Sequence, residues 1–98
     1  MRLEWSPLAM DDRERIFDFI EKDEPRAAIS VDERIAAQVL VLLRFPEGGR
    51  PGRIEGTREL VVRRTPYLVA YRADKDCVRI LRVLHSAQLW PGGLEDLS

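Results

Sequence analysis

The sequence predicts an α+β domain of order β-α-α-β-β-β, in which an N-terminal helical hairpin packs on one face of an antiparallel sheet. Three observations predict this fold. Two apolar stripes at helical spacing occupy the first 43 residues, three short runs rich in Val, Ile, Leu and Tyr occupy residues 58–85, and a Gly/Pro-rich loop separates them. Because 98 residues suffice for one core layer, we expect residues 1–98 to form a single domain.

The helical hairpin is expected after a short strand, RLEW. Ser6 is a good N-cap and Pro7 a good first helical residue. The first apolar stripe ends at KDEP, where Pro25 can open a second helix. The second stripe contains Ala28, Val31, Ile35, Val39 and Leu42.

The segment FPEGGRPGRIEGT, residues 45–57, predicts a long irregular loop because it holds four glycines and two prolines. Strands are expected at 58–63, 66–74 and 77–85, joined by turns at RTP and DKD. Strict alternation in the last strand would put Arg82 on one face with Val78, Ile80 and Leu84. The opposite face would hold Cys77, Arg79, Leu81, Val83 and His85. Since both faces carry apolar residues, we expect a partner or the chain tail to half-cover the second one.

The charged residues are divided unevenly along the chain, although the net charge is only −1. Residues 1–43 contain 6 basic and 10 acidic residues, whereas residues 44–85 contain 10 basic and 5 acidic ones. This asymmetry predicts a basic face that binds an anionic partner, either nucleic acid or an acidic protein segment.

Several classes of protein and site are excluded by composition. A single cysteine, Cys77, excludes an internal disulfide and a cysteine-rich zinc site. One histidine and no spaced carboxylate set give no support for a metal site, and Asp11 and Asp12 are explained by the helix dipole. GGRPG is not a phosphate loop because no GK[ST] follows it, so no cofactor is expected. With no apolar run of membrane-spanning length and no signal-peptide segment, we expect a soluble cytoplasmic protein.

A few side chains remain as functional candidates. Arg63 and Arg64 form either a solvated turn or an anion-binding pair. His85 is either a general acid or base, or a strand-end histidine held by a backbone partner, which we favour. Tyr67 and Tyr71, four apart on one strand, favour packing over base stacking. Trp5 and Trp90 are expected to cover the core.

Four segments in order, LEWSP-A--D, GR-EGTREL, PYLVAYR and VRILRVLHSAQLWP, together resemble the ParE/RelE superfamily of bacterial toxins over about residues 2–91. The resemblance implies the fold given above and growth arrest by the free toxin. It also implies a cognate antitoxin of the ParD or RelB kind, encoded beside the toxin, whose acidic C-terminal segment binds it.

The superfamily implies two alternative activities. RelE-like members are ribosome-dependent mRNA endoribonucleases that use basic side chains of the sheet, whereas ParE-like members poison DNA gyrase and carry no nuclease machinery. The nuclease pattern places an arginine at Leu68 and two lysines at Glu59 and Val61, and none of these residues supplies positive charge to a phosphate. We therefore favour the gyrase poison, a non-enzymatic toxin.

The resemblance also implies site residues. A ribonuclease would use Arg63, Arg82 and His85 as its remaining catalytic groups. The candidates for target binding in either activity are Arg58, Arg63, Arg64, Arg72, Arg82, His85 and Trp90. A third possibility is a module member that binds its partner without being toxic.

Overall fold

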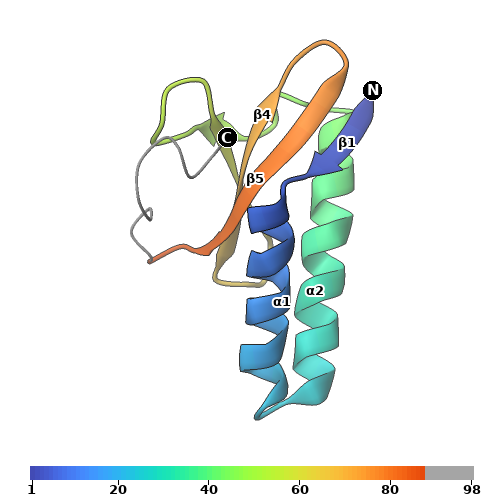
Figure 1. Ribbon diagram of the computed structural model, residues 1–98, viewed down its shortest axis with the longest axis vertical. Helices are drawn as coiled ribbons and strands as arrows, with labels where there is room; N and C mark the ends of the chain where they lie inside the picture. The colour runs from blue at the N-terminus through green and yellow to red at the C-terminus, as the bar shows by residue number, and fades with distance from the viewer. Residues whose placement is uncertain (88–98) are drawn as a thin grey trace.

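The computed structural model describes residues 1–87 and confirms the predicted α+β class (Figure 1). The helical hairpin precedes a meander of strands, and all strands join one sheet of order β1-β5-β4-β3-β2. The elements are β1 (Arg2–Trp5), α1 (Pro7–Glu21), α2 (Pro25–Leu40), the 3₁₀ helix η1 (Val41–Leu43), β2 (Arg50–Pro51), β3 (Arg58–Val61), β4 (Tyr67–Ala73) and β5 (Cys77–His85).

The sheet is mixed, which corrects one detail of the prediction. β2, β3, β4 and β5 pair antiparallel, but β1 lies parallel to β5, with Arg2 opposite Cys77 and Trp5 opposite Ile80. Parallel neighbours need a long connection, and here the hairpin and the meander together supply it. A second addition is β2, which forms inside the loop that was expected to be irregular.

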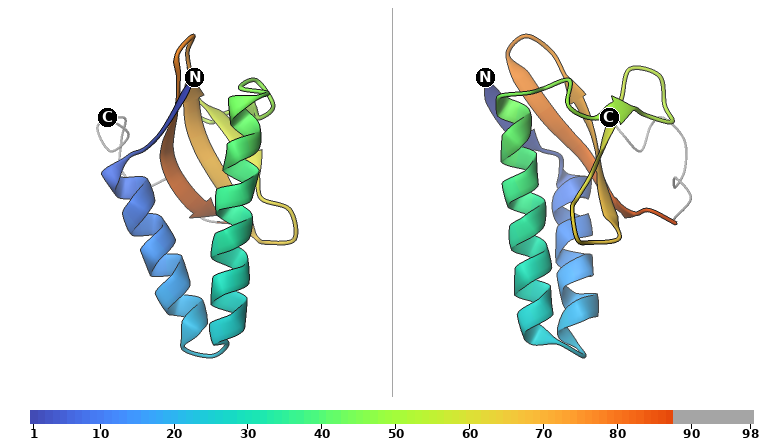
Figure 2. Two further views of the ribbon diagram at one scale, coloured as in Figure 1. Left: turned by 90° about the vertical axis from the view of Figure 1, so that its right-hand side faces the viewer. Right: turned by 180° about the vertical axis from the view of Figure 1, so that it is seen from behind.

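Local signals in the sequence place the two helices correctly. The Ser6 hydroxyl accepts the Ala9 N–H at 3.0 Å and caps α1, while Pro7 and Pro25 are the first residues of α1 and α2. The two helices lie side by side, and their connected ends project beyond the sheet (Figures 1 and 2). The hairpin therefore presents outer surfaces on which the sheet does not pack.

The core lies between the helices and one face of the sheet, which we call the core face. Ile35 and Val39 of α2 and Leu42 of η1 are at most 1% exposed, and burial of each such side chain contributes about 1.5–3 kcal/mol. Their partners on the sheet include both tyrosines of β4, so the packing interpretation of Tyr67 and Tyr71 is confirmed. Trp5 packs against this cluster as expected.

A β-bulge between β4 and β5 overturns the predicted division of faces. Ala70 lies opposite Arg82 but Tyr71 lies opposite Ile80, so Leu81 is an additional residue in β5. Beyond the bulge the alternation is reversed, and Val83 joins Val78 and Ile80 on the core face. Arg82 and Leu84 lie on the other face, which we call the outer face. The prediction from strict alternation was wrong, because one extra residue moves every later side chain to the opposite face of the sheet.

The outer face is buried at its centre. Leu68, Ala70 and Leu84 are at most 2% exposed although none of them belongs to the core cluster. A sheet covered on one side only would have a polar outer face, and this sheet lacks one. The sequence predicted this, because it places apolar residues on both faces.

Candidate target-binding surface

Arg82, a candidate for both target binding and catalysis, is instead a buried structural residue. Its guanidinium donates to both carboxylate oxygens of Asp12 on α1, from Nε at 2.8 Å and from Nη2 at 2.9 Å. Asp12 also accepts the Val83 N–H at 2.8 Å, and the side chains of Asp12 and Arg82 are less than 10% exposed. The dipole explanation of Asp12 is therefore incomplete, because this carboxylate closes a buried ion pair.

The backbone of β5 beyond its pairing with β1 explains the position of Asp12. β1 pairs with β5 only as far as Ile80, so the backbone beyond it needs other partners. Ser6 supplies two of them, since its N–H donates to the Ile80 carbonyl at 2.9 Å and its hydroxyl donates to the Leu81 carbonyl at 2.8 Å. Asp12 supplies the next at Val83. The start of α1 thus takes the place of a further strand.

Glu59, which replaces a lysine of the nuclease pattern, organises the loop before β3. Its side chain is 2% exposed and lies 3.2 Å from Arg50 Nη2, while the Arg53 N–H donates to it at 3.1 Å. Val61 and Leu68 lie opposite each other on the same outer face. This part of the outer face therefore carries a paired carboxylate and aliphatic groups where the nuclease pattern has cations.

Arg58 and Tyr71 hold the same loop from its other side. Arg58 donates to the Gly49 carbonyl at 2.9 Å and is half-buried. The Tyr71 hydroxyl accepts the Gly49 N–H at 2.8 Å and donates to the Pro46 carbonyl at 2.9 Å, and burial raises the pKa of Tyr71. A Cβ on Gly49 would lie 2.7 Å from that hydroxyl, which explains the glycine. Arg58 is therefore engaged within the fold rather than presented to a partner.

Three of the candidate arginines are exposed. Arg63 and Arg64 occupy the turn between β3 and β4, and Arg72 lies near the end of β4 opposite Arg79. Arg64 has φ = 62°, a left-handed conformation that is unfavourable for a residue with a side chain. Arg79 lies 3.4 Å from Glu4, so Arg72 is the more available cation of that pair.

His85 lies at the exposed end of β5 and has a backbone partner, as favoured from the sequence. Its Nδ1 accepts the Ala87 N–H at 3.1 Å. Its ring packs in a T-shaped arrangement against the ring of Tyr67, with an interplanar angle of 82° and centroids 5.6 Å apart. His85 lies opposite Tyr67 on the core face, whereas Arg82 lies on the outer face. Arg63, Arg82 and His85 are thus not assembled around one point. Trp90 lies outside the described residues.

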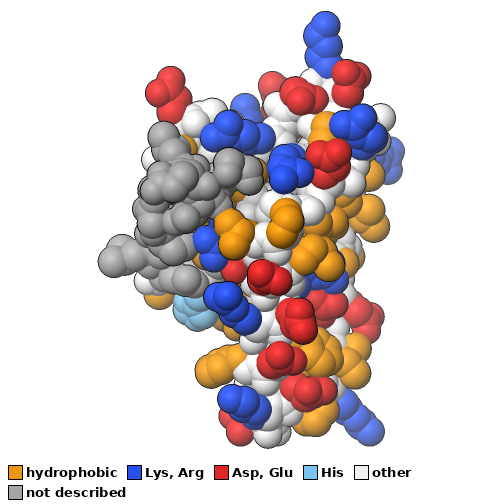
Figure 3. All heavy atoms as spheres, in the orientation of Figure 1, with side chains coloured by type: hydrophobic (Ala, Val, Ile, Leu, Met, Phe, Trp, Pro, Cys, Tyr) orange, Lys and Arg blue, Asp and Glu red, His pale blue; other side chains and the backbone are white. Residues whose placement is uncertain are grey.

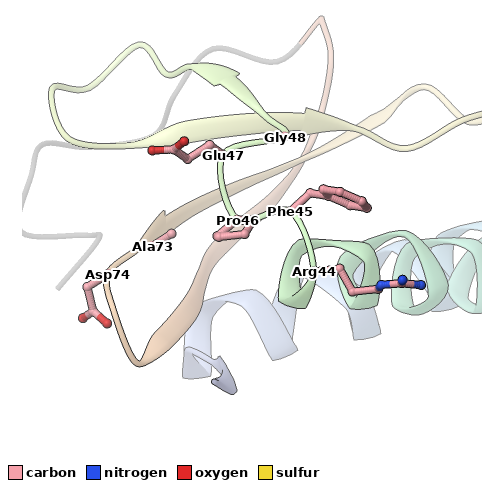
Figure 4. A pocket seen from close by; sticks show the side chains of 7 residues that line it. All are labelled: Arg44, Phe45, Pro46, Glu47, Gly48, Ala73 and Asp74. Carbon is pink, nitrogen blue, oxygen red and sulfur yellow. The ribbon is translucent and has the colours of Figure 1, made fainter.

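A pocket of about 550 Å³ lies between the end of α2 and the end of β4 (Figure 4). Its charged side chains, Arg44, Glu47 and Asp74, point in different directions rather than toward one another. Within residues 1–87, no cluster of three or more His, Cys, Asp or Glu side chains is placed to bind a metal ion. Neither described helix is long and apolar enough to cross a membrane. The exposed arginines are therefore the best-supported candidates for recognition of an anionic partner.

The helical hairpin on a five-stranded mixed sheet is the architecture of the toxin superfamily that the sequence resembles. Residues 3–90 match the family model of the ParE toxin of the type II toxin-antitoxin system parDE. The chain belongs to this family.

Individual relatives agree with this assignment. A Sinorhizobium fredii protein named "Putative toxin Y4kP" is 46% identical over 90 residues, which cover 92% of this chain and 93% of the relative. A solved chain of the chromosomal ParDE system of P. aeruginosa is 28% identical, with a TM-score of 0.79 over 87% of this chain and 95% of that one. The Mycobacterium tuberculosis toxin-antitoxin complex RelBE2 is similar at 29% identity and a TM-score of 0.58, over 86% and 95% of the two chains.

Proposed function

We propose that this ParE-family toxin poisons DNA gyrase and acts by binding rather than by cutting nucleic acid. The observation that carries the proposal is the placement of Arg82. A ribonuclease needs a cation and an acid–base group at the same phosphate. Here Asp12 engages Arg82 on the outer face, and His85 lies on the core face. Arg63, Arg64 and Arg72 remain exposed and are the proposed contacts with the target.

We further propose that a cognate ParD- or RelB-like antitoxin neutralises the toxin by direct binding. The structural relatives come from systems described as ParDE and RelBE2, in which a toxin is paired with an antitoxin. The exposed arginines suit the acidic C-terminal segment of such a protein. Since gyrase and the antitoxin act in the cytoplasm, the proposal places this chain there.

The test compares DNA supercoiling with mRNA integrity. Purified toxin is added to a gyrase reaction on relaxed plasmid and, separately, to a translating extract. We expect inhibited supercoiling, intact mRNA and no effect of His85→Ala on inhibition. Intact supercoiling together with cut mRNA would overturn the proposal. Normal growth on induction, with no effect in either assay, would identify a module member that binds its partner without toxicity.

The second candidate function is ribosome-dependent mRNA cleavage, and it is favoured by the similarity to the RelBE2 complex. It requires Arg63 or His85 to act at the phosphate after a rearrangement on the ribosome. This activity predicts that His85→Ala or Arg63→Ala abolishes both cleavage and toxicity, whereas Arg15→Ala on the exposed surface of α1 has no effect.

A further inference from the structure

A small hollow lies where the end of the second helix meets the turn between β3 and β4, and we call it the Arg34 hollow. Its volume is about 290 Å³, and it is lined by Arg34, Ala37, Gln38, Val41, Arg63 and Arg64. The three α2 residues are spaced i, i+3 and i+4, so they share one face of the helix. The turn that carries the other two arginines lies beside α2 in both views of Figure 2.

The Arg34 hollow is open because Ala37 is small. The side chain of Ala37 is exposed, and Val41, one helical turn further on, is 46% exposed. A longer side chain at position 37 would occupy the space between the α2 residues and the turn. The hollow is therefore a property of side-chain size as well as of charge.

Every charged residue that lines the Arg34 hollow is an arginine. Within residues 1–87, Arg34, Arg63 and Arg64 form no ion pair with a carboxylate. Six other arginines of this part of the chain do form such pairs, namely Arg2, Arg13, Arg50, Arg53, Arg79 and Arg82. The helical hairpin also differs on the face seen in Figure 3, where acidic side chains gather over it. Three like charges around one small space repel one another, and a bound anion relieves that repulsion.

The turn beside the Arg34 hollow holds its two arginines in a fixed place. The Thr65 N–H and hydroxyl both donate to the Val62 carbonyl, at 3.3 and 2.9 Å, and the Tyr67 N–H donates to the Thr65 hydroxyl at 3.1 Å. Within this turn Arg64 adopts its left-handed backbone conformation. A non-glycine residue kept in such a conformation points to a functional side chain.

The anion that suits this lining is a phosphate group. A guanidinium presents a planar fork of N–H donors that matches two oxygens of a phosphate, and the Gln38 amide adds further N–H donors. The arginines come from two different elements, so they can approach one phosphate from different sides. A nucleic-acid strand also carries a charge at every nucleotide, which supplies more anions to the arginines than a single carboxylate does.

We propose that the Arg34 hollow binds a backbone phosphate of duplex DNA, and that the toxin uses it to hold the DNA on which gyrase acts. This rests on the proposed function, in which Arg63 and Arg64 contact the target. It adds Arg34 and Gln38 to those contacts and makes DNA part of the target. Because gyrase supercoils duplex DNA, phosphates are present wherever the toxin meets the working enzyme. Contacts with phosphates are independent of the base sequence, so no particular DNA site is required.

The first test measures binding of the full toxin chain to a fluorescent DNA duplex by anisotropy, over a series of salt concentrations. We expect the logarithm of the affinity to fall against the logarithm of the salt concentration with a slope of about −2.7 or steeper, because each phosphate contact contributes about −0.9. Arg34→Gln and Arg63→Gln should each weaken binding about fivefold or more and make the slope shallower by about 1. Arg15→Gln, an equal change of charge on the exposed surface of α1, should alter the affinity less than about twofold.

Ala37→Leu tests the shape of the Arg34 hollow separately from its charge. The larger side chain fills the space near the arginines, the net charge is unchanged, and leucine is a good helix former. This variant should also weaken duplex binding about fivefold or more. If Ala37→Leu binds the duplex as tightly as the wild type does, the arginines act as a diffuse basic surface and the proposed site is wrong.

The gyrase supercoiling reaction separates this site from the proposed function. Circular dichroism and urea titration first establish that each variant is folded like the wild type. Arg34→Gln should raise the toxin concentration needed for inhibition about fivefold or more. A wild-type chain that inhibits gyrase but binds no duplex, or binds it equally well after each change in the hollow, overturns the phosphate site alone.

Two other results count against the proposal. If the wild-type chain binds the duplex through the Arg34 hollow and leaves supercoiling intact, the proposed function fails, and with it the role of the hollow at gyrase. A polyglutamate peptide tests the other kind of anion. If the changes in the hollow weaken binding of that peptide and not of the duplex, the hollow is a site for an acidic protein and the proposal is refuted.

Discussion

Removing the carboxylate of Asp12 is expected to be among the most destabilising single changes in this protein. Asp12→Ala deletes three hydrogen bonds at once, two from the Arg82 guanidinium and one from the Val83 N–H, all between 2.8 and 2.9 Å. It removes the Asp12 carboxylate from a guanidinium whose side chain is only 9% exposed. Breaking a buried pair from one side costs about 3–5 kcal/mol, out of a typical total stability of about 5–15 kcal/mol.

A matched control exists on the neighbouring surface. Arg13 donates to Asp32 through Nε at 3.0 Å and Nη2 at 2.9 Å, the same two-point geometry as Arg82 with Asp12. There the arginine and aspartate side chains are 20% and 34% exposed, so water can replace the lost partner. Asp32→Ala should therefore cost about 1 kcal/mol or less.

Urea unfolding and thermal unfolding, both monitored by circular dichroism, measure all of these variants. For a domain of this size, Asp12→Ala should lower the melting temperature by about 12 °C or more. If that variant does not fold, Asp12→Ala/Arg82→Met still tests the reasoning. The double variant buries no unpaired charge and should recover to within about 1–3 kcal/mol of the wild type, the remainder being the unpaired Val83 N–H. If Asp12→Ala and Asp32→Ala lose equal stability, the assigned role of burial is wrong.

Four further predictions test other parts of the fold. Tyr71→Phe should lower the free energy of unfolding by about 1–3 kcal/mol, measured by urea titration, because it leaves the Gly49 N–H without its acceptor. Tyr67→Phe should lower it less. Burial raises the pKa of both tyrosines above the ordinary value of 10.0, so the unfolded chain releases their protons at a lower pH than the folded chain does. The free energy of unfolding should therefore fall as the pH rises above about 10, and the absorbance of the phenolates should appear only on unfolding. Arg64→Gly relieves a φ of 62° and should stabilise the protein by about 1 kcal/mol. Gly56→Ala, at φ = 82° with open space around the added Cβ, should destabilise it by a similar amount. If both changes shift the free energy of unfolding in the same direction, the conformational explanation is wrong. Burial also raises the pKa of the Cys77 thiol, so a thiol reagent at neutral pH should label it only after denaturation, and rapid labelling of the native protein would contradict its burial.

Local signals in the sequence were sufficient for most of the fold. The Ser6–Pro7 cap, the helix opened by Pro25 and the turns flanking β4 all depend on neighbours in the chain, so they could be predicted from residue type and spacing. The sequence could not place the bulge at Leu81, because an extra residue in one strand follows from how two strands fit together. Arg82 was assigned to the wrong face for that reason.

The candidate surface was predicted less completely. Arg63, Arg64 and Arg72 are exposed as expected, but the partners of Arg58 and Arg82 are set by tertiary contacts, one of them between residues 70 positions apart. The exposed apolar residues on the outer side of α2 were not among the predicted surface candidates, because the core stripe is the stronger apolar pattern on this helix. A signal was present, since Arg26 and Arg34 alternate with Ile29 and Ala37 on the opposite side of the same helix.

The way in which α1 completes β5 has a consequence for solubility. An uncovered stretch of strand backbone is a template for pairing with another molecule, which leads to aggregation. Ser6 and Asp12 saturate that stretch where β1 stops, so this flank of the sheet offers a second chain few places to add a strand. This flank of the sheet is therefore protected against the addition of a strand, and it needs no longer first strand for that protection.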